Sequence, residues 1–403
     1  MTRVYPIQLS KTLVRDREID LGNTFEWMHR SVCTGPGGDR YVLSDLAYNY
    51  YRYDSTDERD MVAGHVVSRY APDGEPINQI FVRWASENAG ALYPQTSLCV
   101  LADGRVLFST KRNQAFVLDA ALGSAEEVAA PGAGEKPHWA FRTRLTPSGR
   151  ALCLIGENVV AISTEPMGAV MPPLTAVTAL LRKPNGSTRW PLYCPPNGAS
   201  GEGEALTELD EQIRAVHPGP GGPRPAWLYD AVAIDDSTFV VLTVGWKKKA
   251  YMRGREFMFV LVDAGGKLLG QLDLHTYRDS ASRGVRYDVV VDQARRRIFH
   301  LNTFGLYVFD DAGRRTARLS TDDKEHKPLA RFQLREFDPA GQLVLVHEKD
   351  NLVLTVPVPD DLADLPDAVT DSLALYRKER LRLKKVHRPP NSYWTAEIPI
   401  ASC

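Results

Sequence analysis

In the stretch Ser97-Leu98-Cys99-Val100-Leu101-Ala102-Asp103-Gly104-Arg105-Val106-Leu107-Phe108, two apolar segments flank an Asp-Gly turn. These two residues suit a tight hairpin because Gly accepts a positive φ and Asp hydrogen-bonds its own backbone. The same pattern returns around Thr146-Pro147-Ser148-Gly149 and around Phe337-Asp338-Pro339-Ala340-Gly341, each time before another apolar segment. The chain is therefore predicted to repeat a pair of antiparallel strands.

Less regular copies of this turn lie at residues 35–39, 235–236 and 292–293, which brings the number of repeats to six. The second strand is followed by a third apolar segment, such as Gly305–Phe309, and in most repeats by a polar outer segment. Four antiparallel strands form the blade of a β-propeller. We therefore predict an all-β, six-bladed β-propeller over residues 10–358, with a seventh blade possible.

The strand-turn-strand rhythm of residues 10–358 resembles six-bladed propellers of the NHL and SMP-30 type. The resemblance implies a fold and no particular chemistry, because propellers carry many unrelated activities. The last repeat, which begins near Phe332, has no evident outer strand after Val358. We expect the N-terminal strand, residues 12–21, to complete this blade and to remove the unpaired sheet edge.

Two regions fall outside the repeat. Residues 165–226 hold eleven of the 27 prolines and are predicted to form a long Pro/Gly-rich loop or lid, with a short helix at 204–216. The C-terminal region, 359–403, is predicted to hold a helix at 367–385 with a basic end, followed by a tail. That basic end could bind an acidic partner or RNA, or could simply be a solvated helix face.

The charge balance argues against a general affinity for polyanions. The 403 residues include 49 basic and 50 acidic side chains, so no overall field attracts nucleic acid or anionic lipid. No apolar run approaches the ~20 residues that cross a bilayer, and no secretion signal is evident at the N-terminus. We therefore expect a cytoplasmic protein with no membrane contact.

The sequence has no motif for a metal or a cofactor. Its five cysteines are scattered without a CxxC pair, which predicts neither a zinc site nor a disulfide framework. Phosphate-binding and nucleophile motifs are also missing. We expect no metal and no cofactor, and the role of the terminal Cys403 stays open.

Chemistry in a propeller usually collects where the innermost strands line the central channel. Two consecutive repeats place a Tyr-Asp pair at the same point, Tyr229-Asp230 and Tyr287-Asp288. Polar residues of the other inner strands could face them and together bind a cation or a polar molecule, or supply an acid and a base. Alternatively, these groups only hydrogen-bond neighbouring blades. The candidate ligand-binding residues are His29, Arg30, Gln95, Arg142, Tyr229, Asp230, Tyr287, Asp288 and Gln333.

Two loops are candidates for partner binding. The first, at 50–53, is rich in tyrosine, whose side chain buries a large area on binding while few torsion angles become fixed. The second, at 247–253, has several cations around a tyrosine. The alternatives are packing between blades for the first loop and a merely solvated hairpin, or nucleic-acid binding, for the second. The candidate residues are Tyr50, Tyr51, Tyr53, Lys247, Lys248, Lys249 and Arg253.

The leading functional hypothesis is a non-catalytic scaffold that binds a protein partner in a bacterial multiprotein system. The alternative is a lyase, hydrolase or cyclase at the channel mouth that acts on a polar small molecule through Asp230, Asp288, Arg142 and His29, with residues 165–226 as its lid. Nucleic-acid binding is a third possibility. The sequence alone leaves open whether the protein is catalytic.

Overall fold

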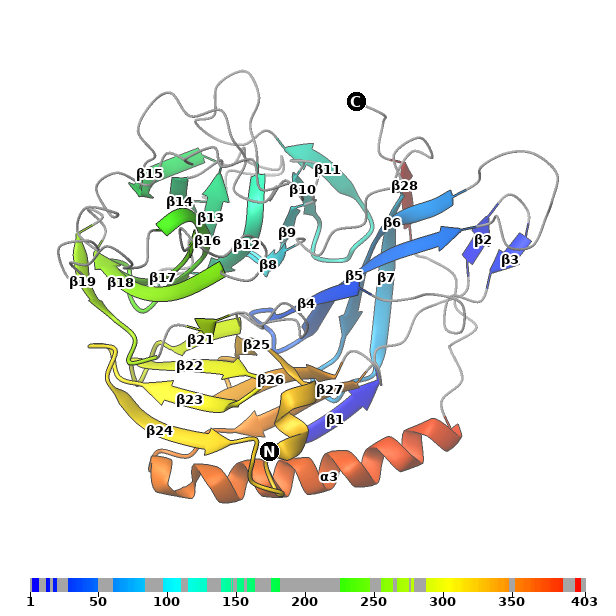
Figure 1. Cartoon of the computed structure of the whole chain (residues 1–403). Coiled ribbons are helices and arrows are strands. Elements are labelled where there is room, and N and C mark those ends of the chain that lie inside the picture. The colour runs from blue at the N-terminus through cyan, green and yellow to red at the C-terminus, as the bar shows by residue number, and fades with distance from the viewer. Residues whose placement is uncertain are drawn as a thin grey trace. The chain divides into compact units, whose positions relative to one another are not determined.

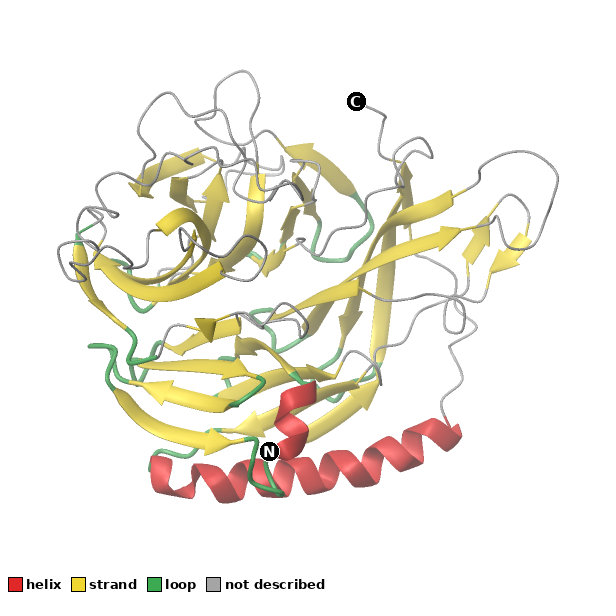
Figure 2. Ribbon diagram, in the orientation of Figure 1, coloured by secondary structure: helices red, strands yellow, loops and turns green. Residues whose placement is uncertain are grey.

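The computed structural model describes residues 2–6, 12–14, 17–19, 28–49, 61–83, 97–109, 115–128, 139–145, 147, 151–155, 158–163, 175–181, 225–246, 255–263, 267–274, 277–278, 288–347, 352–386 and 396–399. The chain divides into two compact units. Unit 1 comprises Met1–Lys111, Ala115–Val128 and Arg331–Cys403, and unit 2 comprises Arg112–Gln114 and Ala129–Ala330. Strands dominate both units (Figure 2).

Unit 1 contains two sheets made of consecutive strands. In the first, β4 to β7 follow one another in space and β28 adds to β7 in parallel. In the second, β8 to β11 follow one another. The bounds are β4 Met28–Thr34, β5 Arg40–Asn49, β6 Met61–Tyr70, β7 Pro76–Arg83, β28 Ala396–Pro399, β8 Ser97–Val100, β9 Val106–Ser109, β10 Ala115–Leu118 and β11 Ala125–Val128.

Unit 2 contains three such sheets, β12 to β15, β16 to β19 and β21 to β24, with β20 pairing to β18. The bounds are β12 Trp139–Leu145, β13 Ala151–Ile155, β14 Asn158–Ser163, β15 Thr175–Leu181, β16 Pro225–Ala233, β17 Thr238–Trp246, β18 Arg255–Asp263, β19 Leu268–Gln271, β20 Tyr277–Arg278, β21 Asp288–Asp292, β22 Arg297–Asn302, β23 Gly305–Phe309 and β24 Arg315–Ser320. A 3₁₀ helix, η3, follows at Lys327–Arg331.

Within each unit the sheets meet through their first strands, which confirms the β-propeller. Strand β4 lies beside β8 in unit 1, and β16 lies beside β12 and β21 in unit 2. Five blades are each built from one continuous stretch of chain, in place of the six or seven predicted. The last repeat supplies only three strands, β25 Gln333–Phe337, β26 Gln342–His347 and β27 Leu352–Pro357, and, as the sequence indicated, it has no outer strand of its own.

The fourth strand of this composite sheet comes from the N-terminus, but from a different segment than predicted. Strand β1, Arg3–Pro6, pairs antiparallel with β27, and Arg3 lies opposite Thr355. Residues 12–21 do not close the sheet, because β2, Thr12–Val14, pairs with β3, Arg17–Ile19, in a hairpin of its own. Pro6 is tolerated in β1 because an edge strand can turn its missing N–H away from the ladder.

The predicted C-terminal helix is present as α3, Leu365–Val386, after a short 3₁₀ turn, η5, at Leu362–Asp364. It lies along β27 and β1 (Figure 1). Its buried side chains, Leu365, Val369, Leu373 and Tyr376, recur at helical spacing and so form one apolar face. Tyr376 meets Phe332 and His347 of the composite sheet, with its ring centroid 4.8 Å from that of Phe332.

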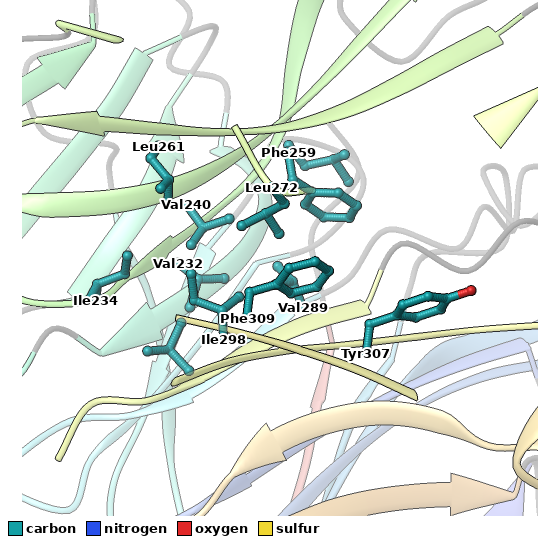
Figure 3. Close-up of a cluster of buried hydrophobic side chains, with 12 residues drawn as sticks. Val232, Ile234, Val240, Phe259, Leu261, Leu272, Val289, Ile298, Tyr307 and Phe309 are labelled. Carbon is teal, nitrogen blue, oxygen red and sulfur yellow. The ribbon is translucent and has the colours of Figure 1, made fainter. Parts of the chain in front are cut away.

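Neighbouring blades are held together by shared apolar faces. Figure 3 shows the cluster in unit 2, where side chains of β16 and β18, such as Val232 and Phe259, face Ile298 and Phe309 of the next blade. Its members alternate along each strand because successive side chains point to opposite faces. A second cluster joins the blades of β5 and β9 in unit 1, with Tyr41 and Phe108 among its members.

Part of the predicted loop at 165–226 is a strand. Thr175–Leu181 forms β15, the outer strand of the first blade of unit 2. Its prolines, Pro172-Pro173 and Pro184, flank the strand and do not interrupt its ladder, which is why a proline count over the whole range was misleading. The predicted helix at 204–216 lies outside the described residues. None of the described helices combines the length and apolarity needed to cross a bilayer.

Candidate functional site

The two predicted aspartates lie on neighbouring strands of unit 2. Asp230 is in β16 and Asp288 opens β21, and both side chains are buried. The Asp230 Oδ1 atom accepts a hydrogen bond of 3.0 Å from the Ala231 backbone N–H. This contact is within the residue's own strand, β16, and does not link neighbouring blades.

Asp288 belongs to a hydrogen-bonded chain that the sequence did not suggest. The ring of His300, on β22, is buried, and its Nδ1 lies 3.0 Å from the Asp288 backbone oxygen. Its Nε2 lies 3.1 Å from Nδ2 of Asn302. The Oδ1 atom of Asn302 accepts from the backbone N–H groups of Phe304 and Gly305, at 2.7 and 3.1 Å.

These contacts determine the protonation of His300. Because Oδ1 of Asn302 accepts two N–H groups, Nδ2 is left to donate to Nε2 of His300, and the ring proton must sit on Nδ1 and point to Asp288. Burial lowers the pKa of His300 to about 4, although its contacts with Asp288 act in the opposite direction. His300 is therefore a neutral structural link near neutral pH and does not exchange protons there.

The hydrogen-bonded chain through His300 and Asn302 ends at a turn that exposes an aromatic ring. We call residues Asn302–Gly305, between β22 and β23, the Phe304 turn. Thr321 holds it from the other side, since its N–H donates to the Phe304 oxygen at 3.1 Å and its hydroxyl donates to the Thr303 oxygen at 2.7 Å. Phe304 nevertheless remains 56% exposed. The turn is thus held by four hydrogen bonds while its largest apolar side chain faces solvent.

The second buried polar group of interest, which we call the Glu336 cluster, lies in unit 1 and comprises Thr34, Arg40, Glu336 and Asp338. Thr34 donates to Glu336 from its backbone N–H at 2.8 Å and from its hydroxyl at 2.7 Å. Arg40 donates to the Thr34 hydroxyl at 2.6 Å and to Oδ2 of Asp338 at 2.5 Å. The cluster thereby joins β4 and β5 to the composite sheet.

Burial is the main influence on the pKa of Glu336. Its side chain is 19% exposed, and burial raises its pKa to about 7, even though Arg40 and the two Thr34 donors favour the ionised form. The carboxylate of Asp338 adds to the rise. Arg40 is closer to Asp338 than to Glu336, whose Oε2 is 3.8 Å from Nη1, so its charge is directed mainly at the aspartate.

The remaining predicted ligand residues are not brought into one described site. His29 and Arg30 lie on β4, Arg142 on β12, Tyr229 on β16 and Gln333 at the start of β25. Of these five, only Gln333 has a described side chain, which is partly buried. Gln95 and Tyr287 lie outside the described residues, as do the predicted partner residues Tyr50, Tyr51, Tyr53, Lys247, Lys248, Lys249 and Arg253.

Comparison with known proteins does not assign a family. No family model matches the chain, and no curated protein matches it. Among solved structures, it is similar to a protein of unknown function from Bacteroides caccae, with 11% identity and a TM-score of 0.32 over 67% of this chain and 80% of that chain. It is also similar to the Pan2 WD40 domain of Neurospora crassa, with 10% identity and a TM-score of 0.36 over 81% of this chain and 88% of that one.

Among the described residues, no group of three or more His, Cys, Asp or Glu side chains is arranged to hold a metal ion. The residues that sequence reasoning missed are His300, Asn302 and Phe304 in unit 2 and the Glu336 cluster in unit 1. A faint signal existed for the turn, because Asn and Gly three positions apart between two apolar strands suit a hairpin. The Glu336 cluster had none, since its members come from opposite ends of the sequence.

The pKa of Glu336 predicts a pH-dependent stability. The folded-state pKa of about 7 lies above the ordinary value of 4.5, so the folded protein holds this proton more tightly than the unfolded chain. The resulting stabilisation is complete below the ordinary value and is lost as pH rises through the folded pKa. Relative to Glu336→Gln, the wild type should lose roughly 2 to 3 kcal/mol of unfolding free energy across this window.

Urea unfolding of wild type and Glu336→Gln at several pH values between the two pKa values measures this difference directly. Glu75→Gln is a suitable control, because Glu75 is exposed. A wild-type-minus-variant difference that does not change with pH would show that Glu336 is ionised throughout.

Proposed function

We propose that the chain is a non-catalytic protein-interaction scaffold of the cytoplasm, acting in a bacterial multiprotein system. One observation carries the proposal. The buried chain from the Asp288 backbone oxygen through His300 and Asn302 holds the Phe304 turn with its ring in solvent. A rigid exposed aromatic residue is well suited to anchor a partner, because little entropy is lost when it is buried.

The β-propeller fold fits this role. The tyrosine-rich and cation-rich loops at Tyr50–Tyr53 and Lys247–Arg253 remain predicted partner contacts.

The enzyme alternative has less support. It depends on the carboxylates of Asp230 and Asp288. The Asp230 carboxylate accepts the Ala231 N–H, whereas Asp288 contacts His300 through its backbone oxygen. A catalytic acid or base near neutral pH needs a pKa near that range, and the neighbouring His300 has been moved away from it. Nucleic-acid binding depends on Lys247–Arg253 and stays a prediction from the sequence.

The scaffold is tested by affinity purification of the tagged full chain from its native source, with partners quantified by mass spectrometry. We expect one or more other proteins in stoichiometric amounts, and at least a tenfold loss of the partner with Phe304→Ala, the effect of removing a hot-spot side chain. Leu269→Ala is the matched control, because Leu269 is 51% exposed on the outer strand β19. Recovery of the wild-type chain without any stoichiometric partner would overturn the proposal.

A further inference from the structure

Two of the most exposed large apolar residues among those described lie in surroundings of opposite charge. Phe304 of unit 2 is 56% exposed and Leu381 of α3 is 64% exposed. Each is one apolar side chain within a charged patch, which is the composition of a small docking surface with a polar rim. Their surroundings indicate what each surface would bind.

The surroundings of Phe304 are acidic. Thr321 contacts both Thr303 and Phe304, so the segment that follows it lies beside the Phe304 turn. That segment exposes three acidic residues, Asp322, Asp323 and Glu325, against two exposed cations, Lys324 and Lys327. We call the three acidic residues the acidic rim.

The surroundings of Leu381 are basic. Residues three and four positions away on a helix are surface neighbours, and on the N-terminal side of Leu381 these are Arg377 and Lys378. Arg377, Lys378 and Arg382 are exposed, and the one acid of this segment, Glu379, already pairs with Arg382 at 2.6 Å. We call residues 377–382 the basic helix end. Cations near a helix C-terminus also favour the helix dipole, but the dipole gives no reason for an exposed leucine at their centre.

We infer that the Phe304 turn and acidic rim of one molecule dock onto the basic helix end of a second copy of this chain. The net charge of −1 leaves no overall repulsion between copies, so the local complementarity can act. Because the two patches differ, the contact is heterologous, and repeated contacts give a closed ring or a linear array. The inference rests on the proposed function in treating the Phe304 turn as a protein-binding surface.

The first test measures the mass of the purified full chain by sedimentation velocity over a range of concentrations. We expect the average mass to rise above the 44.9 kDa of one chain as concentration increases, and to fall again at high salt. Phe304→Ala should weaken the association at least tenfold, while Leu269→Ala should leave it unchanged. A wild type that stays at the mass of one chain at every concentration would overturn the inference.

The second test exchanges the charges. Asp322→Lys with Asp323→Lys, and separately Arg377→Glu with Lys378→Glu, should each abolish self-association. An equimolar mixture of the two variants should restore it, because each now offers the charge that the other lacks. Asp73→Lys with Glu126→Lys, two exposed acids elsewhere, is the control and should have no effect. A misfolded variant cannot be rescued by mixing, so failure of the mixture to associate counts against the contact.

These outcomes separate the inference from the proposed function. The pure chain could stay monomeric while Phe304→Ala still removes another protein from the affinity purification. That result would support the scaffold and contradict the docking between copies. If neither association depends on Phe304, the assignment of this turn as a binding surface falls with both.

Discussion

Replacing Gly305 with alanine is expected to destabilise the protein by about 3 kcal/mol. A Cβ atom at this position would lie 2.2 Å from the backbone oxygen of Leu319 and 3.2 Å from its carbonyl carbon. Both are backbone atoms of β24, which is paired with β23 along its length, so neither can move aside without disturbing the ladder. The backbone at Gly305 also has a φ of 157°, which L side chains rarely adopt.

Urea-induced unfolding of wild type and variant gives the difference in unfolding free energy. Gly37→Ala is the matched control, because a Cβ there meets no atom within 4 Å and its effect should be small. An effect of Gly305→Ala no larger than that of Gly37→Ala would mean that the close approach of β23 and β24 is absent in solution.

Removal of Arg40 is expected to destabilise the protein by about 3 to 5 kcal/mol, because the loss of one partner of a buried ion pair leaves the other charge uncompensated. Arg40→Met keeps most of the side-chain volume but removes the donors to Thr34 and Asp338. The Asp338 side chain is only 1% exposed, so water cannot replace the guanidinium. The variant therefore loses the hydrogen bond that joins β5 to the composite sheet.

Arg296 offers a control with similar chemistry at the surface. It contacts Asp235 and Asp311, each at 2.6 Å, but its side chain is 46% exposed. Arg296→Met should therefore cost no more than about 1 kcal/mol. The double variant Arg40→Met with Asp338→Asn should recover part of the loss, since the buried charge of Asp338 is then removed together with its partner. If Arg40→Met and Arg296→Met had equal effects, Arg40 would not be buried with its charge.

The sequence predicted what depends on short-range rules. Gly104 and Gly341 were chosen as turn residues, and both adopt positive φ, at 86° and 77°. The C-terminal helix was predicted at 367–385 from its apolar spacing, and α3 spans Leu365–Val386. In these elements the residues that decide the conformation are neighbours in the chain, so the pattern alone is sufficient.

Features that depend on distant residues were missed or misplaced. Residues 12–21 were expected to complete the last blade, but Thr12–Val14 and Arg17–Ile19 pair with each other as β2 and β3, and β1 pairs with β27 instead. The aspartates of β16 and β21 were identified, but the role of His300 could not be seen without Asn302 and the turn it holds. Glu336 and Thr34 are separated by 302 positions in the chain, and no local pattern connects them.

The pairing of β1 with β27 also constrains how the protein is made. Residues 3–6 are synthesised long before their partners at 352–355. The composite sheet therefore cannot be completed until β27 has been made, and until β1 pairs with it β27 presents an open edge to other nascent chains. A terminal tag or truncation that delays β1 should accordingly lower the yield of soluble protein more than it lowers the stability of the molecules that do fold.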